Sequence, residues 1–169
     1  MKNKLIALAI AVVAFAVTSQ AQSTATATAT ATIVTPISIS NTSNMSFGNI
    51  SVQTSTGGTV VLAPAGTRTR TSGVTLPATA GTVSAAAFTV TGTGSYTYAI
   101  TLPTTVTLTR ASGSETMDAT SFTSNPSGTG TLSAGGTQNF TVGATLTVAA
   151  GQVAGVYTSG NFDVTVNYN

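Results

Sequence analysis

The chain has 169 residues, with five basic side chains, three acidic side chains, no histidine and no cysteine. Without histidine or cysteine, the chain cannot build a Ser-His-Asp triad, a cysteine nucleophile or a thiolate metal site. Two of the basic residues, Lys2 and Lys4, lie at the N-terminus, and the remaining charges balance. The rest of the chain therefore lacks the basic field that nucleic acid or anionic lipid would require.

The N-terminus has the features of a secretory signal peptide. Lys2 and Lys4 precede an uninterrupted apolar run over residues 5–17. This run is shorter than the ~20 apolar residues that a bilayer-spanning helix needs. Small residues at Ser19 and Ala21 predict cleavage after Ala21, which leaves residues 22–169. We expect this mature chain to be exported through the periplasm and to be extracellular or displayed on the cell surface.

The mature chain begins with a low-complexity segment, because residues 23–32 read STATATATAT. In an extended conformation this segment would place an apolar face opposite a hydroxyl face. The apolar face consists of Ala25, Ala27, Ala29, Ala31 and Ile33. Two interpretations remain open, a flexible linker or a strand that pairs with something else. Since Pro36 ends the segment, we predict a signal peptide at 1–21, an N-terminal extension at 22–36 and a β-sandwich domain at 37–169.

Short stretches of alternating apolar and polar residues follow, separated by turns rich in Gly, Pro and Asn. We expect strands at residues 37–40, 45–50, 59–63, 86–91, 95–102, 106–108, 140–148 and 162–168, with turns at 41–44 and 125–128. The stretches 86–91 and 95–102 are expected to form a hairpin. Beyond the signal peptide no helical periodicity is found. The predicted fold is all-β, an immunoglobulin-like two-sheet sandwich with an N-terminal extension strand.

The neighbouring carboxylates Glu115 and Asp118 are the strongest catalytic candidates. Paired carboxylates can hydrolyse glycosidic bonds. A spacing of three residues in an extended chain, however, directs them to opposite faces. We interpret both as solvated surface residues, and we expect no enzymatic activity, no cofactor and no metal site.

Two further pairs share a strand face, and each has two interpretations. Arg68 and Arg70 could bind a carboxylate or phosphate, but the favoured interpretation is that they guard a sheet edge against unwanted pairing. Tyr96 and Tyr98 could stack on a sugar, but core packing is favoured.

Three segments carry a family resemblance: Met45-Ser46-Phe47-Gly48, Ser95-Tyr96-Thr97-Tyr98, and a C-terminal Gly155-Val156-Tyr157 followed by an alternating strand that ends at Tyr168. Over essentially the whole mature chain they resemble the bacterial domain of unknown function DUF4402. More distantly, the chain is similar to spore-coat-U-type subunits of archaic chaperone–usher pili. It departs from those subunits by lacking a cysteine pair and by presenting mainly alanines on its N-terminal segment.

The pilus resemblance implies a structural subunit of a bacterial extracellular fibre (a pilus or fimbria) that polymerises by donor-strand exchange. In that process the N-terminal strand of one subunit completes the sheet of its neighbour. The donor residues would be Ala25, Ala27, Ala29, Ala31 and Ile33. The implied partners are further copies of the chain, a periplasmic chaperone and an outer-membrane usher. The alternative is a monomeric secreted module that binds glycan or protein, with the extension as a linker.

Overall fold

The computed structural model describes residues 22–169, and the predicted signal peptide lies outside them. The chain divides into two units, Met1–Thr32 and Ile33–Asn169. We call residues 22–32 the tail and Ile33–Asn169 the body. Every residue of the tail is exposed and none belongs to a strand. Within the described range there is no helix long and apolar enough to cross a membrane.

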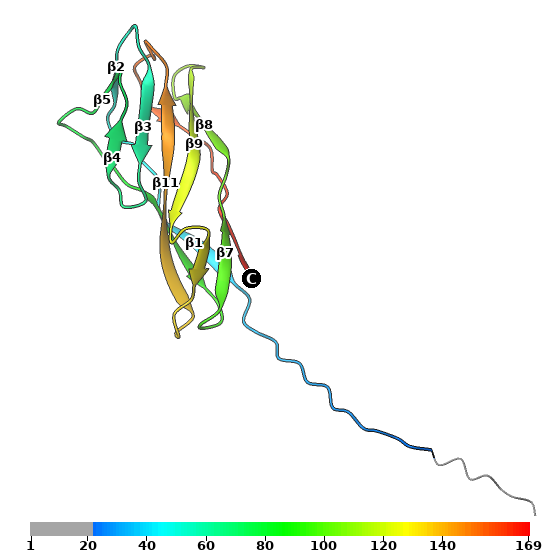
Figure 1. Ribbon diagram of the computed structural model, residues 1–169. Coiled ribbons are helices and arrows are strands. Elements are labelled where there is room, and N and C mark those ends of the chain that lie inside the picture. The colour runs from blue at the N-terminus through cyan, green and yellow to red at the C-terminus, as the bar shows by residue number, and fades with distance from the viewer. Residues whose placement is uncertain (1–21) are drawn as a thin grey trace, which may run out of the picture. The chain divides into compact units, whose positions relative to one another are not determined.

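The body is all-β, which confirms the predicted class (Figure 1). Among the described residues its strands are β1 (Ser38–Ser43), β2 (Ser51–Val52), β3 (Gly58–Leu62), β4 (Arg68–Arg70), β5 (Val74–Thr75), β6 (Ala86–Thr91), β7 (Thr97–Thr101), β8 (Thr105–Arg110), β9 (Thr116–Asn125), β10 (Thr129–Thr131), β11 (Thr137–Val148), β12 (Tyr157–Thr158) and β13 (Thr165–Tyr168). Threonine and β-branched residues fill these strands because they suit a pleated, half-buried surface.

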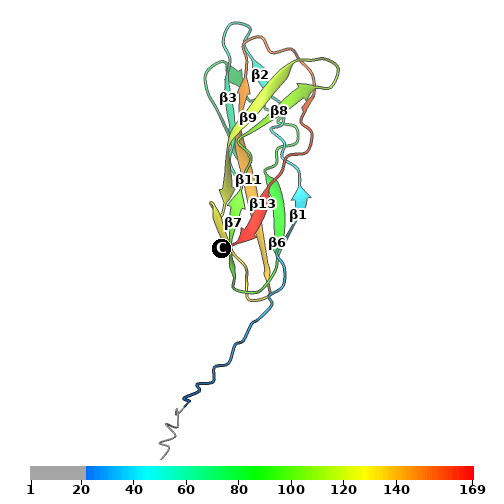
Figure 2. The ribbon, with the colours of Figure 1, turned by 90° about the vertical axis from the view of Figure 1, so that its right-hand side faces the viewer.

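The strands form one large curled antiparallel sheet and two small sheets (Figure 2). The large sheet has the order β1-β6-β11-β9-β8-β12, and the small sheets are β10-β7-β13 and β2-β5. Strand β11 is shared by both halves of the large sheet. Its first half, up to Val142, pairs with β6, whereas its second half, from Ala144, pairs with β3, which in turn pairs with β4. The immunoglobulin-like arrangement of these sheets stays a prediction.

Two apolar clusters fill the body. In the first, β6 and the first half of β11 face β7 and β13, and the Phe88 and Phe140 rings stack with centroids 5.3 Å apart. Tyr98 is fully buried there, and its hydroxyl donates to Gln138 Oε1 at 2.7 Å. The second cluster lies on the second half of β11 and on β3, β8 and β9. Among the described residues, the other contributors to this second cluster come mainly from the segment 45–52 and the two-stranded sheet β2-β5.

The predicted hairpin is wrong. Strand β6 belongs to the large sheet and β7 to a small one, so the loop between them carries the chain from one sheet to the other. Gly92 in this loop makes room for the Tyr168 ring, since a Cβ there would overlap the Tyr168 hydroxyl. Alternation alone did not distinguish a change of sheet from a hairpin, because both place the same residues on the buried face.

Three predicted boundaries also need correction. The turn at 41–44 is wrong, since β1 continues through a bulge to Ser43. The strand expected at 45–50 is reduced to an isolated bridge between Ser46 and Ser84. The last strand begins only at Thr165, so residues 162–164 lie outside it. The turn at 125–128 and the strands at 59–63, 86–91, 106–108 and 140–148 are confirmed to within a few residues.

Candidate functional site

A groove of about 1190 Å³ lies along the second apolar cluster. Its floor consists of inward-facing residues of β8, β9 and β11: Val106, Leu108, Met117, Ala119, Phe122, Leu146 and Val148. Its remaining lining comes mainly from two irregular segments, residues 44–52 and residues 152–163. The groove is therefore bounded on one side by the large sheet and otherwise by chain that contains little regular structure.

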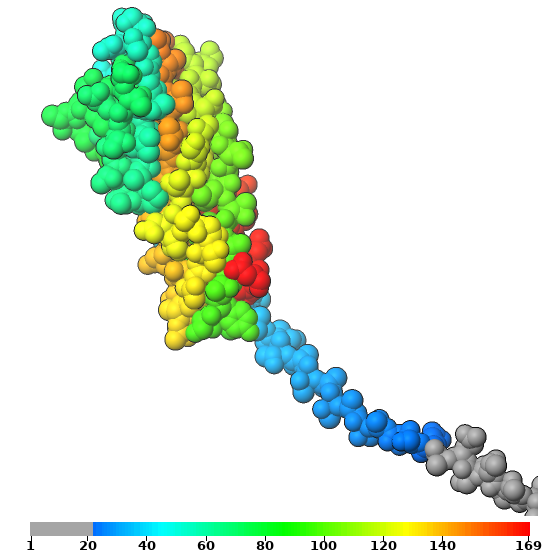
Figure 3. All heavy atoms as spheres, viewed as in Figure 1, coloured from blue at the N-terminus to red at the C-terminus, as the bar shows by residue number. Residues whose placement is uncertain are grey.

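The floor of the groove is only partly covered. Val106, Leu108, Met117 and Phe122 are half-buried, although each packs against the fully buried residues of the cluster. Continuous apolar surface of this kind marks a site for binding another chain or a ligand. Figure 3 shows one face of the body, on which β3, β11 and β9 lie side by side.

The first wall, around Phe47, is fixed by two features. The Arg68 guanidinium donates hydrogen bonds to the backbone carbonyls of Phe47 and Asn49, the second at 3.1 Å. Gly48 has a φ of +66°, and a Cβ there would overlap the carbonyl oxygen of Ala80. A residue with a side chain would be strained in this conformation.

Replacing Arg68 by alanine is expected to destabilise the body by about 1–3 kcal/mol, because hydrogen bonds from a charged group to two carbonyls are lost. Urea unfolding would measure this change. Arg70→Ala is the matched control, since Arg70 lies on the same strand, is exposed and makes no side-chain hydrogen bond among the described residues. Its effect should stay within about 0.5 kcal/mol. Equal losses for both variants would contradict this role for Arg68.

The second wall contains little regular structure. It contains β12, which is two residues long, and then residues 159–163, which lie in no strand. The Phe162 ring packs against Phe122 with centroids 5.7 Å apart and thereby attaches this wall to the groove floor. Two valines near its start are unusually exposed, Val153 at 45% and Val156 at 69%.

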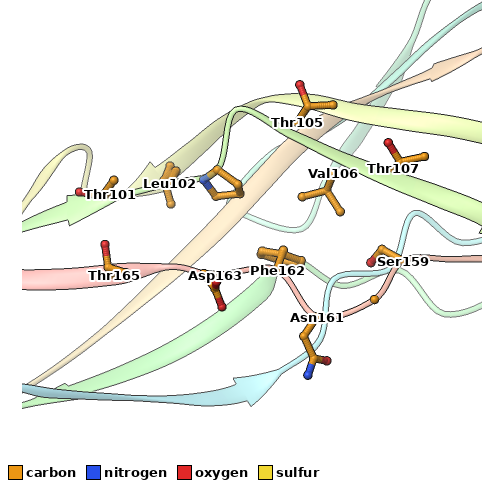
Figure 4. Close-up of a pocket in the computed structure, with 12 residues that line it drawn as sticks. Thr101, Leu102, Thr105, Val106, Thr107, Ser159, Asn161, Phe162, Asp163 and Thr165 are labelled. Atoms are coloured by element: carbon orange, nitrogen blue, oxygen red, sulfur yellow. The ribbon is translucent and has the colours of Figure 1, made fainter.

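A smaller cleft of about 520 Å³ separates the same wall from β8 (Figure 4). Thr105, Val106 and Thr107 lie on its β8 side, and residues 159–163 lie on the other. Figure 4 shows the two segments side by side with Phe162 between them. Residues 159–163 thus run between two cavities, the groove and this cleft.

The root of the N-terminal extension is held at the start of the body. The Tyr168 hydroxyl donates to the Thr35 carbonyl at 2.8 Å and accepts from the Thr93 amide at 2.6 Å. The Thr35 amide in turn donates to Thr93 Oγ1 at 2.9 Å. The Tyr96 ring meets the Tyr168 ring edge-on, with centroids 5.5 Å apart. The chain is therefore fixed at residue 35.

Tyr168→Phe is expected to cost about 1 kcal/mol, because the variant keeps the ring contact and loses two hydrogen bonds. Thermal or urea unfolding of the mature chain would show the loss. Tyr96→Phe serves as the control, since the Tyr96 hydroxyl makes no hydrogen bond within the described range and its removal should leave stability unchanged. An unchanged free energy of unfolding in Tyr168→Phe would show that the hydroxyl does not hold the root.

The predicted donor residues are all exposed. Ala25, Ala27, Ala29 and Ala31 lie in the tail, and Ile33, at the first position of the body, is 98% exposed. None of the five belongs to a strand. Their apolar side chains are thus available for contact with another chain.

The other candidate residues have structural partners. Arg110 binds Glu115 through Nε at 2.7 Å and through Nη2, and this hydrogen bonding lowers the pKa of Glu115. Asp118 instead accepts a hydrogen bond from Thr107 at 2.7 Å. The two carboxylates therefore have different partners, Arg110 for Glu115 and Thr107 for Asp118. Among the described residues no cluster of His, Cys, Asp or Glu could hold a metal ion.

Arg70 lies on β4, which pairs with β3 alone in the described sheet, as an edge-guarding residue would. Arg68 shares that strand but binds the groove wall.

Burial raises the pKa of Tyr98, which packs in the core as expected, whereas Tyr96 remains 44% exposed. The groove's place was not predicted from the sequence. Its one sign there is the segment 152–163, where glycines interrupt the alternation.

A protein-family model described as a domain of unknown function, DUF4402, matches residues 37–168. No curated protein and no solved structure matches the chain. The family match begins directly after Pro36 and covers both groove walls, the groove floor and the C-terminal strand.

Proposed function

The chain belongs to the DUF4402 family, whose description assigns no activity, and we propose from its groove that the protein is a structural subunit of an extracellular fibre. In this proposal the N-terminal segment of one copy enters the groove of the next copy and adds a strand there. The observation that carries the proposal is an apolar groove whose second wall has unpaired backbone. Such a groove offers an incoming strand both apolar contacts and hydrogen bonds.

The backbone of the second wall supports this mode of binding. Residues 159–163 form no backbone–backbone hydrogen bonds in the described part of the chain, although Val164 beside them is buried. Backbone amides and carbonyls without partners are the groups that an added strand pairs with. The immunoglobulin-like fold belongs to the same proposal, since it would then be a sandwich that lacks one strand.

The tail together with Ile33 has a suitable length and pattern. Fully extended, residues 22–33 would span about 40 Å, whereas the six residues of β8 beside the groove span about 20 Å. The segment is therefore long enough to lie along the whole of β8. The alternation of alanine and threonine would place methyl groups on the floor and hydroxyls toward solvent.

The alanines limit the strength of the contact. At about 0.8 kcal/mol for each buried methylene-sized group, four alanines and Ile33 contribute only a few kcal/mol. Backbone hydrogen bonds at about 0.5–1.5 kcal/mol each would contribute a comparable amount. A slip of two residues would replace alanine by alanine, so Ile33 is the residue that sets the register. An exposed donor strand favours aggregation, so a periplasmic chaperone would cap the groove during export. An outer-membrane usher is the further partner in this proposal.

The proposal predicts a face-specific effect of charge in the tail. The variant Ala27→Asp with Ala29→Asp places two carboxylates on the floor of the neighbour's groove, where burying an unpaired charge is strongly unfavourable. We expect it to lose the multimer ladders that the mature chain should show in gels under mild denaturation. Electron microscopy of the same samples should show fibres for the mature chain and none for the variant.

The matched control is Thr26→Asp with Thr28→Asp, which adds the same charge to the opposite face of the tail. This control should still form multimers. If both double variants assembled equally well, or if the mature chain stayed monomeric at high concentration, the fibre function would be wrong. A monomeric binding module for glycan or protein would then be the better interpretation.

A further inference from the structure

Residues 159–163 lie beside a part of the β8 edge that has no partner strand in the described sheet. The segment directly follows β12, whose residues Tyr157 and Thr158 pair with Arg110 and Thr109 of β8. Beyond these pairs β8 continues back to Thr105 and is paired there only with β9, as far as the described sheet extends. One edge of residues 105–108 is thus left open beside a segment that also lacks partners.

The existing pairs define how this ladder would continue. Antiparallel register places Ser159 opposite Leu108, Gly160 opposite Thr107 and Asn161 opposite Val106. The cleft of about 520 Å³ occupies the place of these missing pairs, and its lining contains both segments (Figure 4). Proline is absent from residues 159–163, and Gly160 has open space around it, so the sequence permits the pairing.

We propose that residues 159–161 pair with β8 when a donor strand enters the groove, and that this pairing forms the edge on which the donor is held. This inference rests on the proposed function. A strand has two hydrogen-bonding edges, so the edge that faces β8 leaves the other free for the donor. In the unoccupied body, the net gain of one backbone hydrogen bond does not exceed the cost of fixing the residue that forms it. The donor supplies the second row of bonds, and the two events therefore favour each other.

The test locks the proposed pair with a disulfide. The chain has no cysteine, so Thr107→Cys with Gly160→Cys introduces the only possible bridge. Residues directly opposite in an antiparallel ladder lie within disulfide range, whereas residues offset by two lie farther apart. The acceptor is the mature chain carrying Ala27→Asp and Ala29→Asp, which cannot donate its own tail, and the probe is a labelled peptide of residues 22–35.

With the Thr107→Cys and Gly160→Cys pair oxidised, the acceptor should bind this peptide at least tenfold more tightly than its reduced form. The off-register pair Thr105→Cys with Gly160→Cys should give no gain on oxidation. If the peptide binds the reduced chain and oxidation leaves its affinity unchanged or weaker, the pairing is wrong while the fibre function stands. If the peptide binds neither form, the fibre function itself is wrong and the pairing falls with it.

Hydrogen exchange gives a second measurement that needs no cysteine. On saturation of the acceptor with the peptide, the amides of residues 159–161 and of the open edge of β8 should both slow by tenfold or more. Protection confined to residues 159–161 would mean that the donor pairs there without closing the cleft, and this result would overturn the proposal.

Discussion

A chain carrying Phe140→Ala is expected to lose about 3–5 kcal/mol of unfolding free energy, the range for removing a buried aromatic side chain. Phe140 is 2% exposed, lies in the shared strand β11 and stacks on Phe88 with centroids 5.3 Å apart. Truncation removes both the apolar burial and the ring contact and leaves a cavity between the sheets. Domains of this size are stable by only about 5–15 kcal/mol, so the variant should unfold at a clearly lower urea concentration.

Val61→Ala provides the comparison for Phe140→Ala. Val61 is an apolar residue in a neighbouring strand, but its side chain is 38% exposed. Its truncation should cost less than about 1 kcal/mol, because little apolar area returns to water. Similar midpoints for the two variants would show that the first cluster does not stabilise the body as its burial indicates.

Gly143→Ala should have the second large effect. Gly143 is buried at the point where β11 changes partner from β6 to β3, and a Cβ there would overlap the carbonyl oxygen of Leu62. Backbone atoms in the centre of a sheet cannot move aside without breaking ladder hydrogen bonds. We therefore expect a loss of about 3 kcal/mol, at the upper end of the range for overpacking.

Gly160→Ala is the control for this glycine, because nothing lies within 4 Å of a Cβ built at position 160. Its stability should change by less than about 1 kcal/mol, with a slight gain from reduced freedom of the unfolded chain. Circular dichroism melting curves of the two variants would decide the question. A Gly143→Ala chain that melts with the parent would show that the change of partner tolerates a side chain.

Long alternating stretches were predictable because one buried face leaves a clear period of two. Strand β11 is the best example, since Phe140, Val142 and Leu146 are all buried and the threonines at 141, 145 and 147 are more exposed. Strand partners were not predictable in the same way. Strands β6 and β7 alternate equally well, yet they belong to different sheets, because the pattern records which side is buried and not which strand lies beside it.

The groove could not be predicted from the sequence, for a different physical reason. Its first wall alternates like a strand around Phe47, but the carbonyls of this segment bind the Arg68 side chain, which is distant in the sequence. Its second wall has no alternation that would mark it as a strand. Whether part of a sheet stays uncovered depends on how distant segments pack against it. The sequence of either wall segment alone does not record this packing.

The attachment at Thr35 determines how the body would carry a mechanical load. Beyond this residue the chain enters β1, which is held to β6 by consecutive antiparallel pairs from Ser38↔Thr91 to Asn41↔Phe88. Hydrogen bonds in such a ladder stand perpendicular to the strands. A pull along the axis of β1 therefore strains all of these bonds in shear at the same time and does not peel them apart one by one, so the first strand would resist extraction as a single unit.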